Sequence, residues 1–503
     1  MEFNVAQTLC SAIDWWSKNT PHVAALNLGG MRLTYADLRS WTVRIAERLA
    51  NEGVRPGDRV GICSKNSLEY CALLMAVMRA GAINVPLNAR LTVIELGEVI
   101  ADTDPVVVFC DVDHFQKVGS LGVRVLGLEE LSALRKGKDS EFRIELDPDM
   151  PVVIISTSGS TARPKGVVFS HRTMINYATG FSMEETSCAA GSRILSAAPL
   201  STSAGFVQLT QYTATGCSLY LESTFDPDHF LQVLAGEKIN CFGAVPTFFE
   251  RIAASSNFDA ADLSSIRMAT VGGARVSRAL QEKWKEKGVV LRQIYGQTEA
   301  GGNATIMPAD LAEKFPEKCG WGGIFTELAI IDEDGNRCPP GTAGQIIVRG
   351  PGMMVGYWRN PEATAQTVRD GWLYTGDLGV LDEDGLLTFV DRLKDLIISG
   401  GLNVSAAEVE RAVSEYDGVE EVVVIAAPDP KFGETSMAIV YAAKAIDINA
   451  LVSHCNERLA DYKVPRYVVV EREPLPRLAT GKLSKPALRQ KYKEQFASLP
   501  RVR

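Results

Sequence analysis

The segment Thr157-Ser158-Gly159-Ser160-Thr161-Ala162-Arg163-Pro164-Lys165-Gly166 follows the apolar run Val152-Val153-Ile154-Ile155 after one serine, Ser156. Such a run is typical of a strand that is buried on both faces of a parallel sheet. The segment after it holds four hydroxyl side chains, two glycines and two cations. Glycine lets backbone amides approach a ligand, hydroxyls donate to phosphate oxygens, and an ammonium group adds positive charge. The pattern favours a phosphate-binding loop after a buried strand, with a solvated polar turn as the alternative.

Helical and strand patterns alternate on both sides of this loop. Thr34 is a capping candidate for a helix that runs to about Asn51, and Arg59 to Cys63 follows as a short buried strand. Alternation of this kind favours parallel sheets covered by helices. Further expected elements are a helix at residues 67–80 and strands at 85–87, 106–109, 152–155 and 289–294.

The pattern changes from about Gly335 onward. Turn signals such as Glu383-Asp384-Gly385 separate short strands, and a compact α+β pattern follows Arg392. The expected strands are 345–349, 387–390, 419–426, 438–442 and 467–470, and the expected helices are 406–414 and 448–459. We predict two domains, residues 1–393 and 394–503. The predicted fold class is α/β, with parallel-rich sheets covered by helices and a small barrel-like β part in a large N-terminal region of several subdomains, and a small α+β domain at the C-terminal end.

The composition is that of an ordinary globular protein with more than one domain. The chain has 503 residues, of which 46% are apolar and 22% charged, and its net charge is −9. Because no basic block occurs, we expect no nucleic-acid partner. The ten cysteines form no CxxC pair and the five histidines show no metal-ligand spacing, which argues against a disulfide framework and a histidine-built metal site. With no basic signal region and no apolar stretch long enough to span a bilayer, we expect a cytoplasmic protein without an integral membrane segment.

The glycine-rich loop resembles the TSGTTGxPKG motif of the adenylate-forming superfamily of acyl-CoA synthetases, luciferases and peptide-synthetase adenylation domains. It differs from that motif at Ser160 and Ala162, where the family has Thr and Gly. The resemblance spans nearly the whole chain, and the later motifs occur in the family's order. It implies an enzyme that uses ATP and Mg²⁺ to join a carboxylic acid to coenzyme A, with a mobile C-terminal domain. The resemblance assigns the ATP phosphates to Thr157, Ser158, Gly159, Ser160, Thr161 and Lys165.

The segment Tyr295-Gly296-Gln297-Thr298-Glu299 follows the strand expected at 289–294. A carboxylate at the end of a strand suits Mg²⁺, which prefers carboxylate and phosphate oxygens. A structural tyrosine with a surface acid is the alternative. The segment resembles the family's YGxTE motif, which implies that Glu299 binds the metal, that Thr298 and Glu299 act in catalysis, and that Tyr295 faces adenine. The remaining nucleotide-site candidates are Gly272, Gly273, Ala274, Gly296 and Gln297.

Two further segments match the family near the predicted domain boundary. In Tyr374-Thr375-Gly376-Asp377, the resemblance implies that Asp377 accepts hydrogen bonds from the ribose hydroxyls, a role that suits a carboxylate. In Asp391-Arg392-Leu393-Lys394-Asp395, it implies that Arg392 contacts the ribose and that Lys394 is the interdomain hinge. A cap or Asx turn at Asp377 and a solvated linker at 391–395 are the alternatives.

The C-terminal region contains the last two motifs. Gly400 and Gly401 resemble the glycine-rich loop that lines the pantetheine tunnel in CoA-forming members. Lys482 matches the lysine of the PxxxxGK segment, Pro476 included, which in the family stabilises negative charge as carboxylate attacks the α-phosphate. The alternative is an exposed charge. Lys463 and Arg466 are candidates for the CoA phosphates.

The segment Pro199-Leu200-Ser201-Thr202-Ser203-Ala204-Gly205-Phe206 lies where the family has PL(F/Y)HxxG. Ser201 and Thr202 replace the aromatic residue and the histidine, which leaves a less bulky entrance and removes a gating histidine. Small residues in this region leave room for a cavity or serve tight packing. The candidates for the acyl pocket are Phe181, Ser203, Ala204, Gly205, Phe206 and Gly301.

These observations predict an AMP-forming acid–thiol ligase that acts on a small-molecule carboxylic acid, ATP and CoA. The nearest alternative passes the acyl group to a carrier-protein thiol or to another acceptor, such as O₂ in luciferases. A non-catalytic nucleotide-binding protein is the other alternative, and the joint presence of Lys165, Glu299, Asp377, Arg392 and Lys482 argues against it. The sequence leaves open whether the acid is aryl, branched or fatty, which keeps fatty acid metabolism among the expectations. It also leaves the oligomeric state open, a homodimer included.

Overall fold

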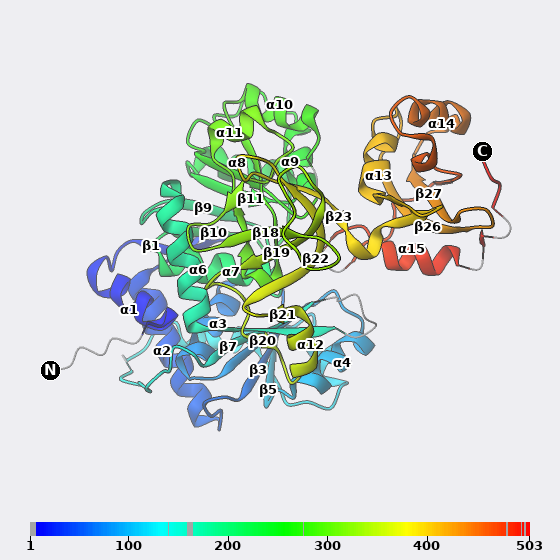
Figure 1. The fold of residues 1–503 in the computed structure, drawn as a ribbon. Coiled ribbons are helices and arrows are strands. Elements are labelled where there is room, and N and C mark those ends of the chain that lie inside the picture. Colours follow the sequence, from blue (N-terminus) through cyan, green and yellow to red (C-terminus); the bar gives the residue numbers. More distant parts are fainter. Residues whose placement is uncertain are drawn as a thin grey trace. The chain divides into compact units, whose positions relative to one another are not determined.

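The computed structural model describes residues 7–138, 140–157, 164–274, 276–478, 481–493, 495–496 and 499–503 (Figure 1). The chain divides into two compact units. The first comprises Met1–Leu328, Ile347–Thr375 and Asp384–Leu387, and the second comprises Ala329–Ile346, Gly376–Glu383 and Thr388–Arg503. The second unit thus includes residues 329–346 and 376–383, which precede the predicted domain boundary.

The apolar run before the glycine-rich loop lies inside a seven-stranded sheet of the first unit. The strand order is β20-β8-β7-β4-β3-β5-β6. Strands β7, β4, β3, β5 and β6 pair in parallel, whereas β8 is antiparallel to β7, and β20 is antiparallel to β8. Every residue of β4 and β5 is buried, as the apolar runs predict for parallel strands. The strands are β3 (Arg59–Cys63), β4 (Ile83–Leu87), β5 (Val107–Cys110), β6 (Val125–Gly127), β7 (Pro151–Thr157), β8 (Lys165–Ser170) and β20 (Gly356–Tyr357).

A second seven-stranded sheet of the first unit has the order β13-β12-β11-β9-β10-β1-β2. All its pairings are parallel except that of β1 with β2. The core against it includes Trp284, whose ring centroid lies 5.0 Å from that of Phe249 and 5.1 Å from that of Phe258. The strands are β1 (Ala24–Leu28), β2 (Met31–Thr34), β9 (Arg193–Ser196), β10 (Ser218–Leu221), β11 (Cys241–Ala244), β12 (Met268–Val271) and β13 (Leu291–Gln293).

Helices cover these sheets and begin at side chains that cap them. Thr34 Oγ1 accepts a hydrogen bond from Asp37 N at the start of α2, and Ser67 Oγ accepts from Tyr70 N at the start of α3. The helices predicted at 34–51 and 67–80 are therefore confirmed. In Figure 1, α2, α3 and α4 surround the sheet that contains β3, β5 and β7, and α8, α9 and α10 lie beside the sheet that contains β11. The helices are α1 (Leu9–Asn19), α2 (Tyr35–Asn51), α3 (Leu68–Arg79), α4 (Val93–Thr103), α5 (Phe115–Gly119), α6 (His171–Glu184), α7 (Ser203–Ala214), α8 (Pro227–Gly236), α9 (Pro246–Ala253), α10 (Arg278–Glu286), α11 (Ala309–Lys314) and α12 (Pro361–Thr367).

The predicted barrel-like β part is a five-stranded sheet with the order β18-β19-β22-β21, in which β23 also pairs with β22. The predicted turn at Glu383-Asp384-Gly385 joins β22 to β23. The strands are β18 (Glu327–Ile331), β19 (Gly344–Arg349), β21 (Val368–Arg369), β22 (Trp372–Leu381) and β23 (Leu387–Arg392). Short hairpins elsewhere pair β14 (Gly296–Gln297) with β15 (Gly302–Asn303) and β16 (Thr305–Ile306) with β17 (Trp321–Gly322).

The C-terminal part of the second unit is a sheet covered on both faces, as the α+β pattern predicts. Val424 and Ala438 belong to the core that includes residues of α13 and α14. Their neighbours Val423 and Ile425 point to the opposite face and pack with Leu488 of α15. The sheet has the order β25-β24-β27-β26, and β28 also pairs with β27. The elements are β24 (Ile397–Ser399), β25 (Leu402–Val404), α13 (Ala406–Ser414), β26 (Glu421–Asp429), β27 (Gly433–Tyr441), α14 (Ile448–Asn456), β28 (Tyr467–Glu471) and α15 (Lys485–Tyr492).

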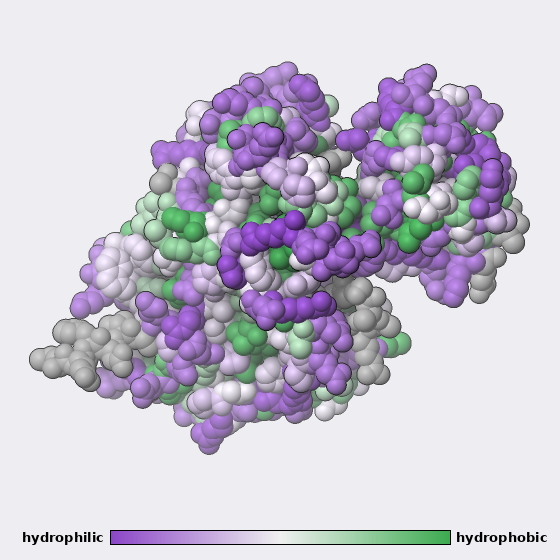
Figure 2. Space-filling model, in the orientation of Figure 1, coloured by the Kyte–Doolittle hydropathy of each residue, from purple (hydrophilic) through white to green (hydrophobic). Residues whose placement is uncertain are grey.

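The surface and the cysteines agree with the composition. All ten cysteines are free thiols. Within the described residues, no helix combines the length and the apolar character needed to cross a bilayer. The face in Figure 2 is largely hydrophilic, with apolar side chains in small groups between polar ones.

Candidate active site

A tight hairpin in the first unit holds Thr298 and Glu299 in its turn. Strands β14 and β15 pair in antiparallel register, and a 3-10 turn, Thr298–Ala300, joins them. Gly301 ends this turn with a φ of +89°, and a Cβ at this position would lie 2.1 Å from the carbonyl oxygen of Gly352. Backbone packing therefore determines the position of the two predicted catalytic residues.

Tyr295 anchors the start of the hairpin. Its amide donates to Thr305 Oγ1 at 2.8 Å, and its carbonyl accepts a hydrogen bond from Ala304 N at 2.9 Å. The residue is only 6% exposed. The adenine contact expected of its ring stays a prediction.

Thr298 connects the hairpin to the start of α7. Its hydroxyl donates to Ser203 Oγ at 2.9 Å. Ser203 is the first residue of α7, and Thr202 caps that helix by accepting a hydrogen bond from Gly205 N. This contact brings together a predicted nucleotide residue and a predicted acyl-site residue that are far apart in the sequence.

Glu299 is held by Tyr357, a residue that sequence reasoning missed. The Tyr357 hydroxyl donates to Glu299 Oε1 at 2.9 Å. The Nζ atom of Lys165 lies 4.9 Å from the centroid of the same tyrosine ring, a favourable place for a cation. Burial, together with the charge of Glu299, raises the pKa of Tyr357, so its hydroxyl stays protonated and remains a donor. The side chain of Tyr357 therefore contacts both the predicted phosphate lysine and the predicted metal carboxylate.

The other nucleotide candidates of the first unit lie around this hairpin or in the glycine-rich loop. Thr157 Oγ1 donates to the carbonyl oxygen of Lys165 at 3.3 Å, across the base of the loop. Ser158, Gly159, Ser160 and Thr161 lie outside the described residues. Gly272 begins the Gly272-Gly273-Ala274 turn, and a Cβ there would lie 3.1 Å from Ile294 Cγ1, two residues before the hairpin.

A second cluster, in the second unit, contains the predicted ribose residues. Arg392 Nε lies 3.7 Å from Asp377 Oδ1, and the Asp377 side chain is only 10% exposed. The neighbouring Asp391 stabilises the chain around Arg392, since its Oδ2 accepts hydrogen bonds from Ser405 Oγ at 2.8 Å and from Ala407 N at 2.9 Å. The pair therefore offers a buried carboxylate beside a half-exposed guanidinium.

Lys482 belongs to the same cluster. The lysine is exposed at the surface, but the protein atoms around its ammonium group desolvate it and lower its pKa. The positive charge of Arg392 lowers the pKa further, and Asp377 opposes that effect. Lys482 therefore lies within electrostatic range of the ribose candidates, and its role at the α-phosphate stays a prediction.

Lys394, the predicted hinge, lies close to these charges. Desolvation and Arg392 lower its pKa, while the adjacent Asp395 raises it. Asp395 itself forms a 2.8 Å ion pair with Arg489 of α15. A hinge role for Lys394 stays a prediction.

The predicted CoA residues occupy the second unit without forming one open site. Gly400 and Gly401 form the turn between β24 and β25, and Gly400 N donates to the carbonyl oxygen of Phe432 at 2.8 Å. The Lys463 ammonium group donates to both carboxylate oxygens of Glu408, at 2.7 and 2.8 Å. Arg466 is 8% exposed, and its guanidinium carbon lies 4.5 Å from the centroid of the Phe432 ring. Contact of these residues with CoA stays a prediction.

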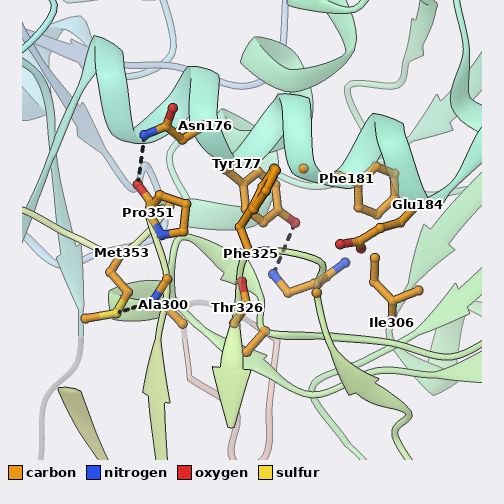
Figure 3. A pocket seen from close by; sticks show the side chains of 16 residues that line it. Asn176, Tyr177, Phe181, Glu184, Ala300, Ile306, Phe325, Thr326, Pro351 and Met353 are labelled. Atoms are coloured by element: carbon orange, nitrogen blue, oxygen red, sulfur yellow. Dashed lines mark hydrogen bonds between the residues drawn. The ribbon is translucent and has the colours of Figure 1, made fainter. Parts of the chain in front are cut away.

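Figure 3 shows a hollow beside the hairpin, on its α6 side. Aromatic and apolar side chains form most of its wall, and Glu184 contributes the carboxylate. Desolvation raises the pKa of Glu184, and its carboxylate accepts a hydrogen bond from Ile324 N. The residues labelled in Figure 3 are Asn176, Tyr177, Phe181, Glu184, Ala300, Ile306, Phe325, Thr326, Pro351 and Met353.

The acyl-site candidates are divided between this hollow and α7. Phe181 lines the hollow, whereas Phe206 is fully buried in α7 and Ala204 is exposed near its start. Gly205 serves close packing, because a Cβ there would lie 2.2 Å from the carbonyl oxygen of Pro199. Gly301 serves close packing as well, since it faces Gly352. Their contact with an acyl group stays a prediction.

Comparison with known proteins identifies the family. The family model of AMP-binding enzymes matches residues 13–358, and that of the AMP-binding enzyme C-terminal domain matches residues 408–482. Feruloyl-CoA synthase from Amycolatopsis sp. is 38% identical over 95% of this chain and 97% of its own length. Long-chain-fatty-acid–CoA ligase FadD13 from Mycobacterium tuberculosis is 31% identical over 92% of this chain and 93% of its own length.

A solved structure repeats the fold. O-succinylbenzoate coenzyme A synthetase from Bacillus subtilis, in complex with ATP and a magnesium ion, superimposes with a TM-score of 0.86 at 29% identity. The match covers 94% of this chain and 98% of that protein. On the strength of both family models and of these relatives, the chain belongs to the family of AMP-binding enzymes.

Proposed function

We propose that this chain activates a carboxylic acid and transfers it to CoA in two half-reactions. It is an AMP-forming acid–CoA ligase, the class to which the compared relatives belong. In the first half-reaction, a carboxylate oxygen attacks the α-phosphorus of ATP, and pyrophosphate leaves. In the second, the CoA thiol attacks the acyl carbonyl, and AMP leaves with the bonding electron pair.

The arrangement of Lys165, Tyr357 and Glu299 is the observation that best supports this proposal. Lys165 offers a positive charge for ATP phosphate oxygens, and Tyr357 orients the carboxylate of Glu299 through its 2.9 Å hydrogen bond. One oriented carboxylate beside a phosphate site fits Mg²⁺, which is usually held by one or two carboxylates together with substrate phosphates. Within the described residues, no group of three ligating side chains could hold a metal alone, in keeping with a metal that enters with the nucleotide. When bound, Mg²⁺ would neutralise charge on the phosphates of the leaving group.

Asp377, Arg392 and Lys482 have the chemistry to bind a ribose and an α-phosphate. The Asp377 carboxylate can accept hydrogen bonds from two ribose hydroxyls. Lys482 can stabilise the charge that develops on the α-phosphate during attack, a step that depends chiefly on positioning and charge. The second half-reaction would follow rotation at Lys394, which would bring the Gly400-Gly401 turn to the thiol.

The first experiment measures ATP–pyrophosphate exchange with a panel of carboxylic acids, for wild type and Lys482→Ala. Lys444→Ala is the matched control, because Lys444 is an exposed lysine of the same unit. We expect Lys482→Ala to lower exchange by about 100-fold or more, the size of effect seen when one charge-stabilising donor is lost. Full exchange in Lys482→Ala would refute its role, and no exchange by the wild type with any acid would refute adenylation.

The second experiment identifies the acceptor. Mass spectrometry should detect an acyl-CoA after addition of free CoA to enzyme, acid and MgATP. Accumulation of acyl-AMP that CoA does not consume would point to a carrier-protein thiol or another acceptor. The two relatives are named for different acids, one for an aryl acid and the other for a long-chain fatty acid. All ten thiols of this chain are free, which suits a reducing cytoplasm.

A further inference from the structure

One face of α7 lies along the hairpin that holds Thr298. Ser203 accepts the hydrogen bond from Thr298, and Val207 Cγ1 lies 3.5 Å from the place of a Cβ on Gly302. Side chains three and four residues apart share a helix face, so Gln211 continues the row of Ser203 and Val207. This face therefore extends along α7 from the residue that contacts Thr298.

Two amide groups near this face are buried without a hydrogen-bond acceptor. Gln211 is 3% exposed, and its Nε2 has no partner in the part of the chain that the structure describes. The same holds for Nε2 of Gln297, which pairs with Gly302 across the hairpin. Leaving a donor buried and unsatisfied costs about 1–3 kcal/mol, so an oxygen acceptor on a bound ligand would stabilise these two donors. By contrast, Gln208 of the same helix already accepts a hydrogen bond from Ser196 Oγ.

A third donor lies beside Gly302. The Tyr177 hydroxyl of α6 accepts a hydrogen bond from Asn303 N at 3.2 Å, drawn as a dashed line in Figure 3. It also lies 3.1 Å from the place of a Cβ on Gly302, the position near which Val207 lies as well. Burial raises the pKa of Tyr177 to about 12, so the hydroxyl keeps its proton and can donate it. Three neutral donors thus belong to the segments that meet at Gly302.

We propose that Gln211, Gln297 and Tyr177 select a carboxylic acid whose far end carries neutral oxygen acceptors, such as hydroxyl, alkoxy or carbonyl oxygens. The inference rests on the proposed ligase function and narrows its substrate class. An unsubstituted alkyl chain would leave the amide donors unsatisfied and is selected against. A second carboxylate is also disfavoured, because these three residues bring no positive charge to offset its burial.

The test compares two acids of one skeleton that differ only in oxygen substituents, together with an unsubstituted alkanoate. For wild type, kcat/KM for acyl-CoA formation is measured with 4-hydroxy-3-methoxycinnamate, with cinnamate and with octanoate. We expect the oxygenated acid to exceed the other two by at least about tenfold, the effect of one lost hydrogen bond in a buried site. Equal or higher values for cinnamate or octanoate would overturn the proposal while leaving the ligase function intact.

The variants Gln211→Met and Gln297→Met remove each amide and nearly preserve side-chain volume. Gln281→Met is the control, because the Gln281 amide of α10 donates to the carbonyl oxygen of Pro316. We expect either glutamine variant to reduce the preference for the oxygenated acid by about tenfold, and we expect Gln211→Met to leave KM for ATP unchanged. If Gln211→Met does not fold, Gln297→Met decides the matter. An unchanged preference in a folded variant would show that water satisfies the donors, and the proposal would fall. Absence of any acyl-CoA with every acid would instead contradict the ligase function.

Discussion

The hydroxyl of Tyr357 donates a 2.9 Å hydrogen bond to the carboxylate of Glu299. The two residues are distant in the sequence, and they meet because β20 pairs with β8 while Met354 N donates to the carbonyl oxygen of Glu299 at 2.9 Å. A carboxylate held in this way keeps its second oxygen available for a cation. Tyr357 therefore positions Glu299, the predicted metal carboxylate.

Replacing Tyr357 with Phe should weaken the use of MgATP. The ring would remain near Lys165, but the bond to Glu299 would be lost, and a hydrogen bond to a charged group is worth about 1.5–3 kcal/mol. We expect kcat/KM for MgATP in the exchange reaction to fall by about 10- to 100-fold, with a higher Mg²⁺ concentration needed for half-maximal rate. Tyr416→Phe, in the second unit, is the matched control. An unchanged Mg²⁺ dependence would contradict the positioning role.

The lowered pKa of Lys482 predicts an alkaline limit to adenylation. Desolvation and Arg392 place this pKa below the usual value for lysine, so the ammonium group is lost at a lower pH than from a free lysine. Activity that depends on the charged form should be full below this pKa and should fall as the pH rises through it. Lys482→Arg keeps its charge throughout that range. We expect a lower overall exchange rate in this variant, and we expect the alkaline decline of its pH–rate profile to occur at higher pH than in the wild type. If both proteins lose activity over the same pH range, Lys482 is not the titrating group.

His171 predicts a loss of stability in mild acid. The residue is fully buried, Leu9 N donates to its Nδ1 at 3.3 Å, and desolvation lowers its pKa to about 4. The folded state therefore resists protonation, so this contribution to stability is complete above pH about 6.5 and is lost as the pH falls toward 4. Linkage gives a loss of roughly 2 kcal/mol in the free energy of unfolding between pH 7.5 and pH 5.

Urea unfolding at these two pH values checks the effect of His171. His171→Asn should show a smaller change than wild type, since asparagine does not titrate and can still accept the bond from Leu9 N. His22→Asn, at an exposed histidine, is the control. An equal pH dependence in wild type and His171→Asn would mean that other groups account for the acid sensitivity.

Variants at Gly301 and Gly191 allow the cost of backbone strain to be measured apart from the cost of a steric clash. Both have a positive φ, +89° and +83°, but only at Gly301 would a Cβ meet a neighbouring atom, the Gly352 oxygen at 2.1 Å. We expect Gly191→Ala to cost about 1–2 kcal/mol of stability from conformation alone and to leave exchange activity intact. Gly301→Ala should cost more and should abolish exchange, because the turn with Thr298 and Glu299 must shift. Thermal unfolding and exchange assays distinguish the two, and equal behaviour would contradict the close-packing role of Gly301.

Local signals in the sequence predict most of the secondary structure. Capping residues such as Thr34 and Ser67 and buried runs such as Arg59 to Cys63 depend on neighbours within a few positions. The boundaries of later strands shift by a few residues: β27 runs from Gly433 to Tyr441, whereas the apolar pattern suggests 438–442. The cause is that the ladder with β26 continues through the polar residues Glu434, Thr435 and Ser436.

The candidate site is harder to predict from the sequence than the secondary structure, because its contacts join residues that are far apart in the chain. Nothing near Tyr357 in the sequence indicates a partner at Glu299, although a tyrosine in a Gly-Tyr-Trp segment is a signal worth testing. Likewise, the sequence shows Lys463 as a free cation, whereas the structure pairs it with Glu408. The buried amides of Gln211 and Gln297 become visible only when the partners of every polar atom are known.

The pairing of β20 with β8 also has a consequence for synthesis of the protein. Tyr357 lies in register with Val167, about 190 residues earlier in the chain. A ribosome that has made the glycine-rich loop and the hairpin has therefore not yet supplied the strand that orients Glu299. Long-range pairing of this kind forms late and slowly. The nascent chain should thus lack the tyrosine that holds Glu299 until β20 has emerged and paired with β8.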